Sequence, residues 1–311
     1  MTNSIKIATR GSKLALYQAN KVKEELEKKI PGKTFEIKII KTKGDKILDV
    51  ALSKIGDKGL FTKELETSLL AGETDLAVHS LKDIPTEFPK GLMLGGVLER
   101  AEFCDALVSR TGKKFLELDE TDIIATSSLR RKAQLLHINP KLKIVDIRGN
   151  VDTRLHKMND GYCTAMIMAS AGLQRLGYHN IITEIINPEV IIPAVSQGAI
   201  AIEIREADSA IGALIDKINH QPTLLAVEAE RVFLRSLEGG CQVPIGCYSS
   251  VAGDRYKITG FVSDLDGSAM LKDSLEGKLS EANEIARKLA EDFCSKGALE
   301  IIQKIRSVNN V

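Results

Sequence analysis

Over its first two thirds the chain alternates short runs of β-forming residues with helical patterns, and this alternation constrains the fold more than any other feature. After a β-type run at Ile5–Ala8, apolar residues from Ala15 to Leu26 recur at helical spacing, and Pro31-Gly32 ends the pattern. Such alternation is typical of α/β units with mostly parallel sheets. Further strands are expected at 35–41, 75–79, 122–126, 143–147 and 164–169, and further helices at 60–71, 128–138, 152–159 and 171–176.

Two segments of the chain, 7–12 and 124–128, resemble each other, because both pass from a strand through a polar turn into a helix. One interpretation is chance, since β-turn-α units often use Ser and Thr as helix caps. The other is two similar lobes that face each other across a cleft. In that arrangement two helix N-termini would direct backbone N–H groups at one anionic ligand.

A third region with a different pattern begins near His220. A helix is expected at 221–237, hairpin-like strands at 248–253 and 256–264, and two helices at 281–293 and 299–306. This order predicts a small α+β domain with an antiparallel sheet.

Charge and composition exclude several classes of protein. The 43 Lys and Arg against 42 Asp and Glu leave a formal net charge of +1, which excludes a uniformly basic nucleic-acid binder. Aromatic residues make up 4% of the chain, which disfavours base-stacking platforms. The five cysteines are scattered along the chain, which predicts free thiols in the cytoplasm. No apolar run is long enough to predict a membrane segment or a signal peptide.

Arginines gather in the turns of the expected α/β units. Arg130 and Arg131 open one helix, Arg148 follows a strand with Arg154 one turn into the next helix, and Arg10 lies in the first turn. A single arginine is most often a solvated surface charge. A group at the carboxyl ends of strands, where α/β proteins bind ligands, favours a small ligand with several anionic groups.

Two further positions are candidates for chemistry. Asp83 follows a buried strand in a loop shaped by Pro85, and it is either a salt-bridged turn residue or a carboxylate that stabilises positive charge and manages a proton. Cys241 follows Gly239-Gly240, and it is either a buried inert thiol or a site of covalent attachment.

The polar, glycine-punctuated segment 43–59 is either a simple loop or a mobile lid. The cysteine and histidine spacing predicts no metal site.

Read in order, these segments resemble the porphobilinogen deaminase family along nearly the whole chain. The matching motifs are Ala8-Thr9-Arg10-Gly11-Ser12, Lys58-Gly59-Leu60-Phe61, His79-Ser80-Leu81-Lys82-Asp83-Ile84-Pro85, Thr126-Ser127-Ser128-Leu129-Arg130-Arg131, Ile147-Arg148-Gly149-Asn150-Val151-Asp152-Thr153-Arg154, Gln174-Arg175-Leu176, Ser196-Gln197-Gly198 and Leu237-Glu238-Gly239-Gly240-Cys241.

The resemblance implies a transferase of haem biosynthesis that joins four porphobilinogen molecules into 1-hydroxymethylbilane with release of ammonia. A dipyrromethane cofactor, held by a thioether to Cys241, is the primer from which the chain of pyrrole rings grows. The implied fold has two doubly wound α/β domains like those of periplasmic binding proteins, with a cleft between them, and a C-terminal α+β domain with a three-stranded antiparallel sheet. The implied domain bounds are 1–99 with 198–219, 100–197, and 220–311.

The same resemblance assigns roles to individual residues. Asp83 would stabilise the cation formed when ammonia leaves, and other side chains would bind the carboxylates of the pyrrole rings. For the cofactor these are Cys241, Lys82, Ser12, Thr126, Ser128, Arg130, Arg131, Arg148 and Gly149, and for the substrate Arg10, Arg148, Arg154, Arg175 and Gln197. The expected protein is a monomer that binds neither nucleic acid nor membrane. A binding protein without turnover is the main rival, and it would need neither Asp83 nor Cys241.

Overall fold

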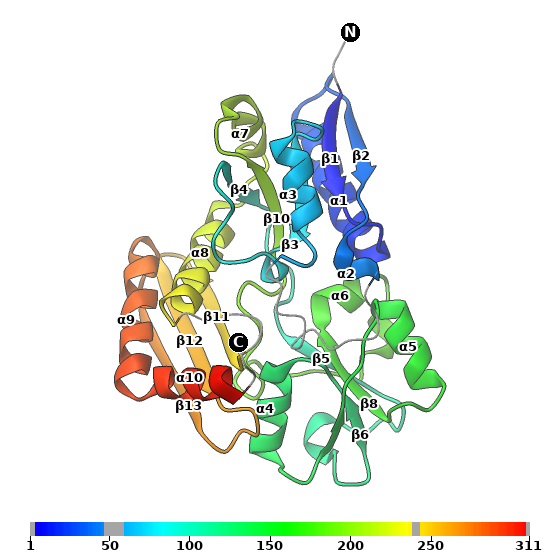
Figure 1. The fold of residues 1–311 in the computed structure, drawn as a ribbon, viewed down its shortest axis with the longest axis vertical. Coiled ribbons are helices and arrows are strands. Elements are labelled where there is room, and N and C mark those ends of the chain that lie inside the picture. The colour runs from blue at the N-terminus through cyan, green and yellow to red at the C-terminus, as the bar shows by residue number, and fades with distance from the viewer. Residues whose placement is uncertain (1–3, 47–58, 238–242, 309–311) are drawn as a thin grey trace. The chain divides into compact units, whose positions relative to one another are not determined.

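The computed structural model describes residues 4–46, 59–237 and 243–308 (Figure 1). The chain forms two compact units. The first falls within residues 1–48, 57–101 and 198–224, and the second takes in 102–197 and 225–311. The expected division of the second unit into a domain at 100–197 and a domain at 220–311 stays a prediction. None of the helices in the described ranges has both the length and the apolar character needed to cross a bilayer.

The first unit is built on a five-stranded sheet in the order β2-β1-β3-β10-β4. β1 pairs in parallel with β2 and β3, whereas β10 is antiparallel to both β3 and β4. The strands are β1 (Ile5–Thr9), β2 (Phe35–Ile39), β3 (Leu76–Ser80), β4 (Leu92–Val97) and β10 (Ile200–Arg205), and the helices are α1 (Lys13–Lys29), α2 (Lys43–Lys46), α3 (Lys63–Leu70) and α7 (Ser209–Ile215).

The helix α1 forms where the sequence pattern predicts it. The Ser12 side chain accepts a hydrogen bond from the Ala15 N–H at 3.3 Å, which satisfies one of the unpaired donors of the first turn. Its apolar face, which includes Val22 and Leu26, is buried in one core with Ile7 of β1. The helix is thereby fixed against the sheet, and its N-terminus lies beside the carboxyl end of β1.

The second unit contains a five-stranded sheet in the order β7-β6-β8-β5-β9. β6 is parallel to β7 and β8, and β5 is antiparallel to β8 and β9, so the plan repeats that of the first unit. The strands are β5 (Asp105–Ser109), β6 (Ile123–Ala125), β7 (Lys143–Val145), β8 (Ala165–Ala169) and β9 (Glu184–Ile185), the helices are α4 (Leu129–Ile138), α5 (Val151–Asn159) and α6 (Ser170–Arg175), and 3₁₀ turns lie at Phe115–Glu117 and His179–Ile181.

The topology favours the second interpretation of the internal resemblance. Segments 7–12 and 124–128 contain equivalent strands, β1 and β6, each second in its sheet, and each is followed by a helix capped by a serine, Ser12 or Ser128. The chain therefore contains two similar α/β lobes. That they face each other across a cleft stays a prediction.

The expectation of mostly parallel sheets is wrong, because half of the strand pairings in each of the two five-stranded sheets are antiparallel. The strands β5 and β10, missing from the predicted elements, are the source of the antiparallel pairs. Nearly all residues of both strands are buried, so neither shows a hydrophobic period of two. β4 was also missed, and it contains the pair Gly95-Gly96, which weakens the β-forming character of its sequence.

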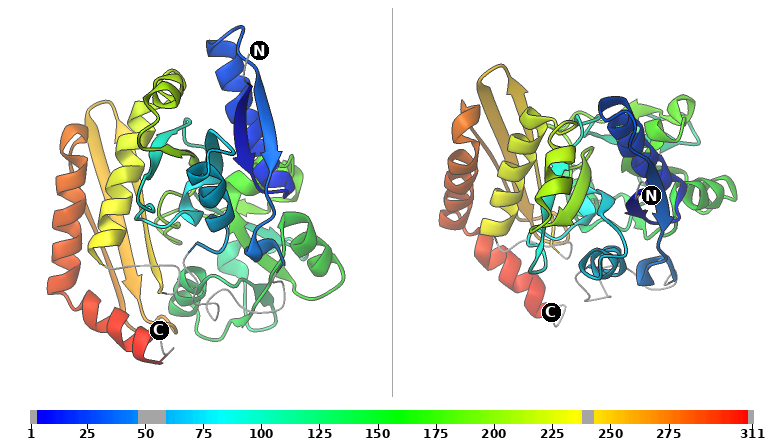
Figure 2. Two further views of the ribbon diagram at one scale, coloured as in Figure 1. Left: turned by 45° about the horizontal axis from the view of Figure 1, so that its top comes forward. Right: turned by 90° about the horizontal axis from the view of Figure 1, so that it is seen from above.

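The C-terminal part of the second unit has the expected three-stranded antiparallel sheet, in the order β11-β12-β13. Figure 2 shows α9 lying along this sheet, where it contacts β12 and β13. In the core the rings of Phe233 and Phe293 meet edge to face at 5.3 Å, and Gly260 leaves room for Phe233. The elements are α8 (Gln221–Ser236), β11 (Ile245–Ala252), β12 (Arg255–Ser263), β13 (Met270–Lys278), a 3₁₀ turn at Leu279–Glu281, α9 (Ala282–Ser295) and α10 (Ala298–Val308).

Candidate active site

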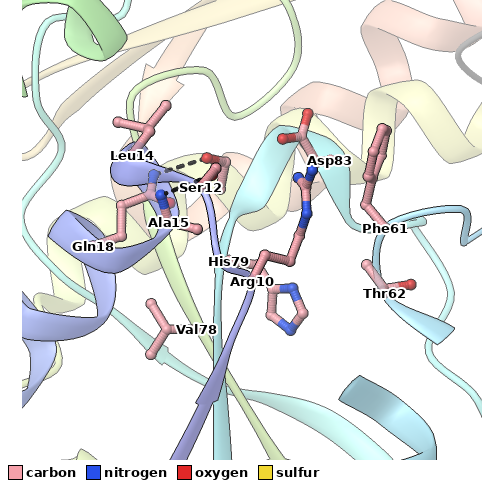
Figure 3. A pocket seen from close by; sticks show the side chains of 11 residues that line it. Arg10, Ser12, Leu14, Ala15, Gln18, Phe61, Thr62, Val78, His79 and Asp83 are labelled. Atoms are coloured by element: carbon pink, nitrogen blue, oxygen red, sulfur yellow. Dashed lines mark hydrogen bonds between the residues drawn. The ribbon is translucent and has the colours of Figure 1, made fainter. Parts of the chain in front are cut away.

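A pocket in the first unit gathers residues that follow the strands β1 and β3 (Figure 3). We call it the Asp83 pocket, and its lining residues are Arg10, Ser12, Leu14, Ala15, Gln18, Phe61, Thr62, Val78, His79, Ser80 and Asp83. Because β1 and β3 are parallel, Arg10 and Asp83 lie at the same edge of the sheet, where ligands of α/β proteins bind.

Asp83 is held by a short rigid turn. Residues Leu81–Asp83 form a 3₁₀ turn, and the buried Leu81 donates its N–H to the Ala199 carbonyl at 3.1 Å. Ile84 is also buried and has an extended backbone, as Pro85 predicts. Asp83 itself is exposed and Lys82 is half-buried. Two apolar anchors therefore fix the backbone that presents the carboxylate.

Arg10 has a carboxylate partner that the sequence did not reveal. Its Nη2 lies 2.5 Å from Oδ1 of Asp45, and its guanidinium lies 4.1 Å from the centre of the Phe61 ring. Burial opposes ionisation of Asp45, but the charge of Arg10 and the hydrogen bond from Thr42 outweigh it and lower the pKa of Asp45. Arg10 thus enters the pocket in a fixed orientation, with part of its charge offset.

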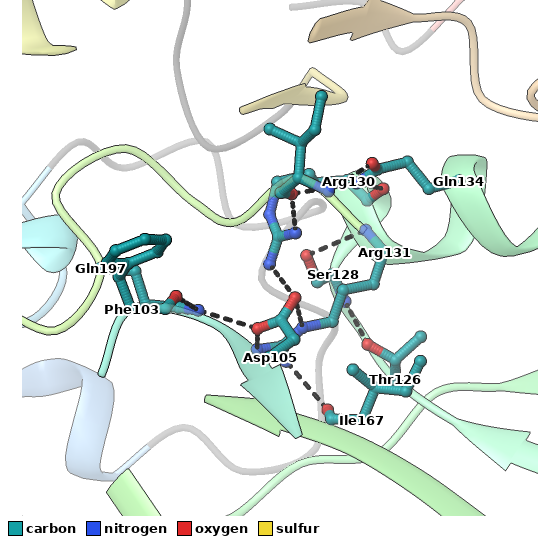
Figure 4. Close-up of polar contacts among 10 residues, drawn as sticks. Phe103, Asp105, Thr126, Ser128, Arg130, Arg131, Gln134, Ile167 and Gln197 are labelled. Carbon is teal, nitrogen blue, oxygen red and sulfur yellow. Dashed lines mark hydrogen bonds and ion pairs between the residues drawn. The ribbon is translucent and has the colours of Figure 1, made fainter. Parts of the chain in front are cut away.

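In the second unit Arg130 and Arg131 are buried and bind one carboxylate, that of Asp105 (Figure 4). Arg130 donates through Nη2 at 2.8 Å, and Arg131 donates through Nε at 3.1 Å and Nη2 at 2.6 Å. Gln197 donates its amide to the same carboxylate at 2.9 Å. We refer to Asp105, Arg130, Arg131 and Gln197 as the Asp105 cluster.

The Asp105 cluster carries a net charge of +1, since two guanidinium groups share one carboxylate. Burial opposes ionisation of Asp105, but the charges of Arg130 and Arg131 outweigh it and hold its pKa far below the usual range. Burial also lowers the pKa of Arg130. The uncompensated positive charge favours an anionic ligand at this place. The only sequence signal for Asp105 is a charged residue at the start of an apolar run.

A second arginine group consists of Arg148, in the loop between β7 and α5, and Arg154, in the first turns of α5. The Arg154 Nε donates to the Gly149 carbonyl at 2.8 Å, and Gly149 has φ +117°, which favours glycine. Asn150 caps α5 by accepting the Thr153 N–H at 2.9 Å. The Nη1 of Arg148 is buried and has no hydrogen-bond partner among the described residues. An unpaired buried donor of this kind favours an acceptor from a ligand.

The two arginine-bearing loops are joined by Ser127. Its hydroxyl donates to the Ile147 carbonyl at 2.8 Å and accepts the Ile147 N–H at 2.9 Å. On the first loop Thr126 Oγ1 accepts the Ser128 N–H at 3.3 Å, and Ser128 Oγ accepts the Arg131 N–H at 3.4 Å. The structure therefore brings these candidates together at the carboxyl edge of the second sheet.

The remaining candidates are less fully placed. Arg175 lies in the last turn of α6, which begins directly after β8 at the same carboxyl edge. Cys241 lies outside the described residues. Of the expected lid at 43–59, Lys43–Lys46 form α2, while 47–58 lie outside the described residues. In the described ranges no group of three or more His, Cys, Asp or Glu side chains could hold a metal ion.

Comparison with solved structures finds weak likeness to periplasmic and extracellular bacterial proteins. A periplasmic domain of BvgS from Bordetella pertussis matches 74% of this chain and 90% of its own at 14% identity, with a TM-score of 0.43. A probable amino-acid ABC transporter extracellular-binding protein from Bacillus subtilis matches 76% of this chain and 97% of its own at 14% identity, also with a TM-score of 0.43.

Comparison with sequence families and relatives is specific. Residues 5–213 match the model "Porphobilinogen deaminase, dipyromethane cofactor binding domain", and residues 224–295 match "Porphobilinogen deaminase, C-terminal domain". A porphobilinogen deaminase from Pelotomaculum thermopropionicum is 48% identical over 306 residues, 98% of each chain. One from Synechococcus is 49% identical over 306 residues, covering 97% of this chain and 96% of its own. The chain therefore belongs to the porphobilinogen deaminase family.

Proposed function

We propose that this chain catalyses the reaction of its family, in which four porphobilinogen molecules are joined head to tail into 1-hydroxymethylbilane and ammonia is released. The observation that carries this proposal is the match to both family models, which together span most of the chain. The cofactor is dipyrromethane, as the description of the first model indicates. When bound, it supplies a covalent primer whose terminal ring accepts the first substrate.

The described residues suit a cofactor of this kind. Each pyrrole ring carries an acetate and a propionate, so a two-ring primer brings four carboxylates. The net charge of +1 on the Asp105 cluster and the unpaired Nη1 of Arg148 suit such an anion. We propose that these arginines, with Lys82, Ser12, Thr126, Ser128 and Gly149, hold the cofactor, and that Cys241 is its point of attachment.

We assign the charge-stabilising role to Asp83. Loss of ammonia from porphobilinogen leaves a cation shared with the pyrrole N–H, and a carboxylate close to that N–H would stabilise it and assist proton transfer. Support comes from the turn anchored by Leu81 and Ile84, because a carboxylate on a fixed backbone needs little reorganisation as charge develops.

For the substrate carboxylates we assign Arg10, Arg148, Arg154, Arg175 and Gln197. Arg10 is supported by its place in the Asp83 pocket and by Asp45 and Phe61, which orient its guanidinium. Gln197 acts through the Asp105 cluster, since its amide donates to Asp105 and to the Phe103 carbonyl at 2.7 Å.

The attachment of the cofactor is tested by the intact mass of the purified protein. We expect an excess of two pyrrole units that maps to the peptide containing Cys241. Cys241→Ser should carry no adduct, while Cys294→Ser should keep it. A wild-type chain, produced in cells that make porphobilinogen, with the bare polypeptide mass would contradict the proposal.

Turnover is tested by Asp83→Asn, with Glu87→Gln as a control that removes one negative charge from the same exposed loop. Asp83→Asn should fold normally and lose a factor of about 10²–10⁴ in turnover, the usual contribution of a proton-handling group. The control should behave as wild type. Near-normal turnover in Asp83→Asn would refute the role of Asp83.

We also propose that the protein has three domains and acts as a monomer in the cytoplasm. The free thiols predicted from the scattered cysteines suit a reducing compartment. Sedimentation equilibrium should give one chain of 33.9 kDa, and cell fractionation should recover the activity with cytoplasmic markers.

A further inference from the structure

A buried group of two carboxylates and one imidazole lies beside the Asp83 pocket. His79 of β3 and Glu203 of β10 lie diagonally on neighbouring antiparallel strands, since Ala201 is the residue directly opposite His79. Their side chains are 4% and 0% exposed, and Nε2 of His79 lies 3.0 Å from Oε2 of Glu203. Glu66 is also buried, and it lies on α3, which packs against both β3 and β10. We call these three residues the His79 cluster.

The charges of the His79 cluster do not balance unless it holds protons. If all three side chains were ionised, two buried negative charges would face one positive charge, and an uncompensated buried charge is strongly unfavourable. Burial raises the pKa of Glu66, and the nearby charge of Glu203 raises it further. The charged groups around the cluster are Lys63 on α3 and, in the pocket that His79 lines, Arg10 and Asp83.

The hydrogen bonding of the cluster is incomplete. Although His79 Nε2 and Glu203 Oε2 are 3.0 Å apart, they are not aligned for a hydrogen bond. Both oxygens of Glu203 are buried and have no hydrogen-bond partner among the described residues. A structural ion pair in a core normally satisfies its polar atoms, and groups that do not do so recur at reactive sites. The three residues are not a metal site.

The cluster is connected to the pocket by two of its lining residues. His79 and Thr62 both line the Asp83 pocket, as does Arg10 (Figure 3). The imidazole therefore lies against the buried carboxylate of Glu203 and also lines the pocket. Histidine is suited to pass protons near neutral pH.

We propose that His79, Glu203 and Glu66 form a proton store for the reaction in the Asp83 pocket. In each coupling porphobilinogen enters with its aminomethyl group as ammonium, the C–N bond breaks with its electron pair going to neutral ammonia, and a cation remains. A free ring carbon attacks this cation, one C–C bond forms, and that ring carbon then loses its hydrogen as a proton. The cluster takes up this proton and returns it through His79, and the proton finally leaves with ammonia as ammonium. Atoms and charge balance without another reactant. The inference rests on the proposed function, because it takes Asp83 to lie where coupling occurs.

Infrared difference spectroscopy of the uniformly ¹³C-labelled wild-type holoenzyme gives the direct test, because the label separates protein carboxyl bands from those of the substrate. On addition of porphobilinogen we expect a protein carboxylic-acid band to change during turnover and to be missing in Glu66→Gln. A wild-type spectrum without any change in protonated carboxyl groups would overturn the proposal, even if every variant failed to fold.

Kinetics of variants give the second test. Glu203→Gln and Glu66→Gln should lower kcat by about 10²-fold, the lower end for proton-handling groups, with KM little changed and an altered pH profile. Glu206→Gln removes the same charge from an exposed position three residues beyond Glu203 and should match wild type. Folded Glu203→Gln and Glu66→Gln proteins with wild-type pH profiles would overturn the proposal.

The two proposals fail separately. If Asp83→Asn keeps its turnover, the role of Asp83 is refuted whatever the cluster does. If Asp83→Asn loses turnover while the cluster variants keep it, the proton store alone is refuted.

Discussion

Replacing Asp105 with asparagine should destabilise the second unit by about 3–5 kcal/mol, the usual cost of removing one partner from a buried ion pair. The carboxylate accepts hydrogen bonds from Arg130, Arg131 and Gln197 at 2.6–3.1 Å. Asparagine keeps one acceptor oxygen but directs an N–H₂ group at a guanidinium. Two buried positive charges would then face no negative charge.

The measurement is thermal unfolding followed by circular dichroism, with Asp146→Asn as an exposed control in the same unit. At about 2–4 °C per kcal/mol for a unit of this size, the Asp105 variant should melt about 6–20 °C lower. The pKa of Asp105 lies below its unfolded value of about 3.9, so its contribution is complete above that pH and is lost as pH falls through the folded pKa. The difference between wild type and variant should therefore stay constant from about pH 5 to 9. A shift no larger than that of the control would refute the charge argument.

Three further changes test single features of the fold. Gly149→Ala should lower stability by about 1–3 kcal/mol in thermal unfolding, because φ is +117° and the new methyl would lie 2.6 Å from Cγ2 of Thr153. Gly177→Ala, where the new methyl would meet open space, should cost less. Glu230→Gln should cost about 1–3 kcal/mol, since the buried carboxylate accepts the Ser249 N–H and hydroxyl at 2.8 and 2.6 Å, and faster exchange of that amide would report it. Glu66→Gln should gain stability relative to wild type as pH rises above about 4.3, because the pKa of Glu66 is raised and its ionisation therefore penalises the folded state. A difference in unfolding free energy between variant and wild type that does not vary with pH would contradict this.

The sequence predicted those elements whose signals are local. Ser12 and Ser128 mark helix starts because a serine side chain can satisfy the first free N–H groups, and both serve as caps. The strands β5 and β10 escaped prediction because they are buried on both faces and carry no alternation. Their antiparallel partners β3 and β8 lie far away in the sequence, so no short window of sequence records the direction of pairing.

The same limit applies to the site. The positions of Arg130 and Arg131 at the start of a helix after a parallel strand were predictable from the pattern around them. Their partner Asp105 lies 25 residues earlier on a strand that was not predicted, and Asp45 is separated from Arg10 by 35 residues. Pairs of this kind depend on tertiary folding, so the sequence showed the cations but not the carboxylates that orient them.

These carboxylates change the physical role of the arginines. An arginine in solvent must lose rotamer freedom and hydration when it binds a carboxylate, and both losses weaken binding. Arg130 and Arg131 have lost that freedom already, because Asp105 and the Ile167 carbonyl, at 2.9 Å from Nη1 of Arg131, hold them in the folded protein. Asp105 neutralises one of the two charges and leaves the other for a ligand. We infer that a fixed geometry with one unbalanced charge, more than the number of arginines, suits this edge of the sheet to hold an anionic primer in one orientation.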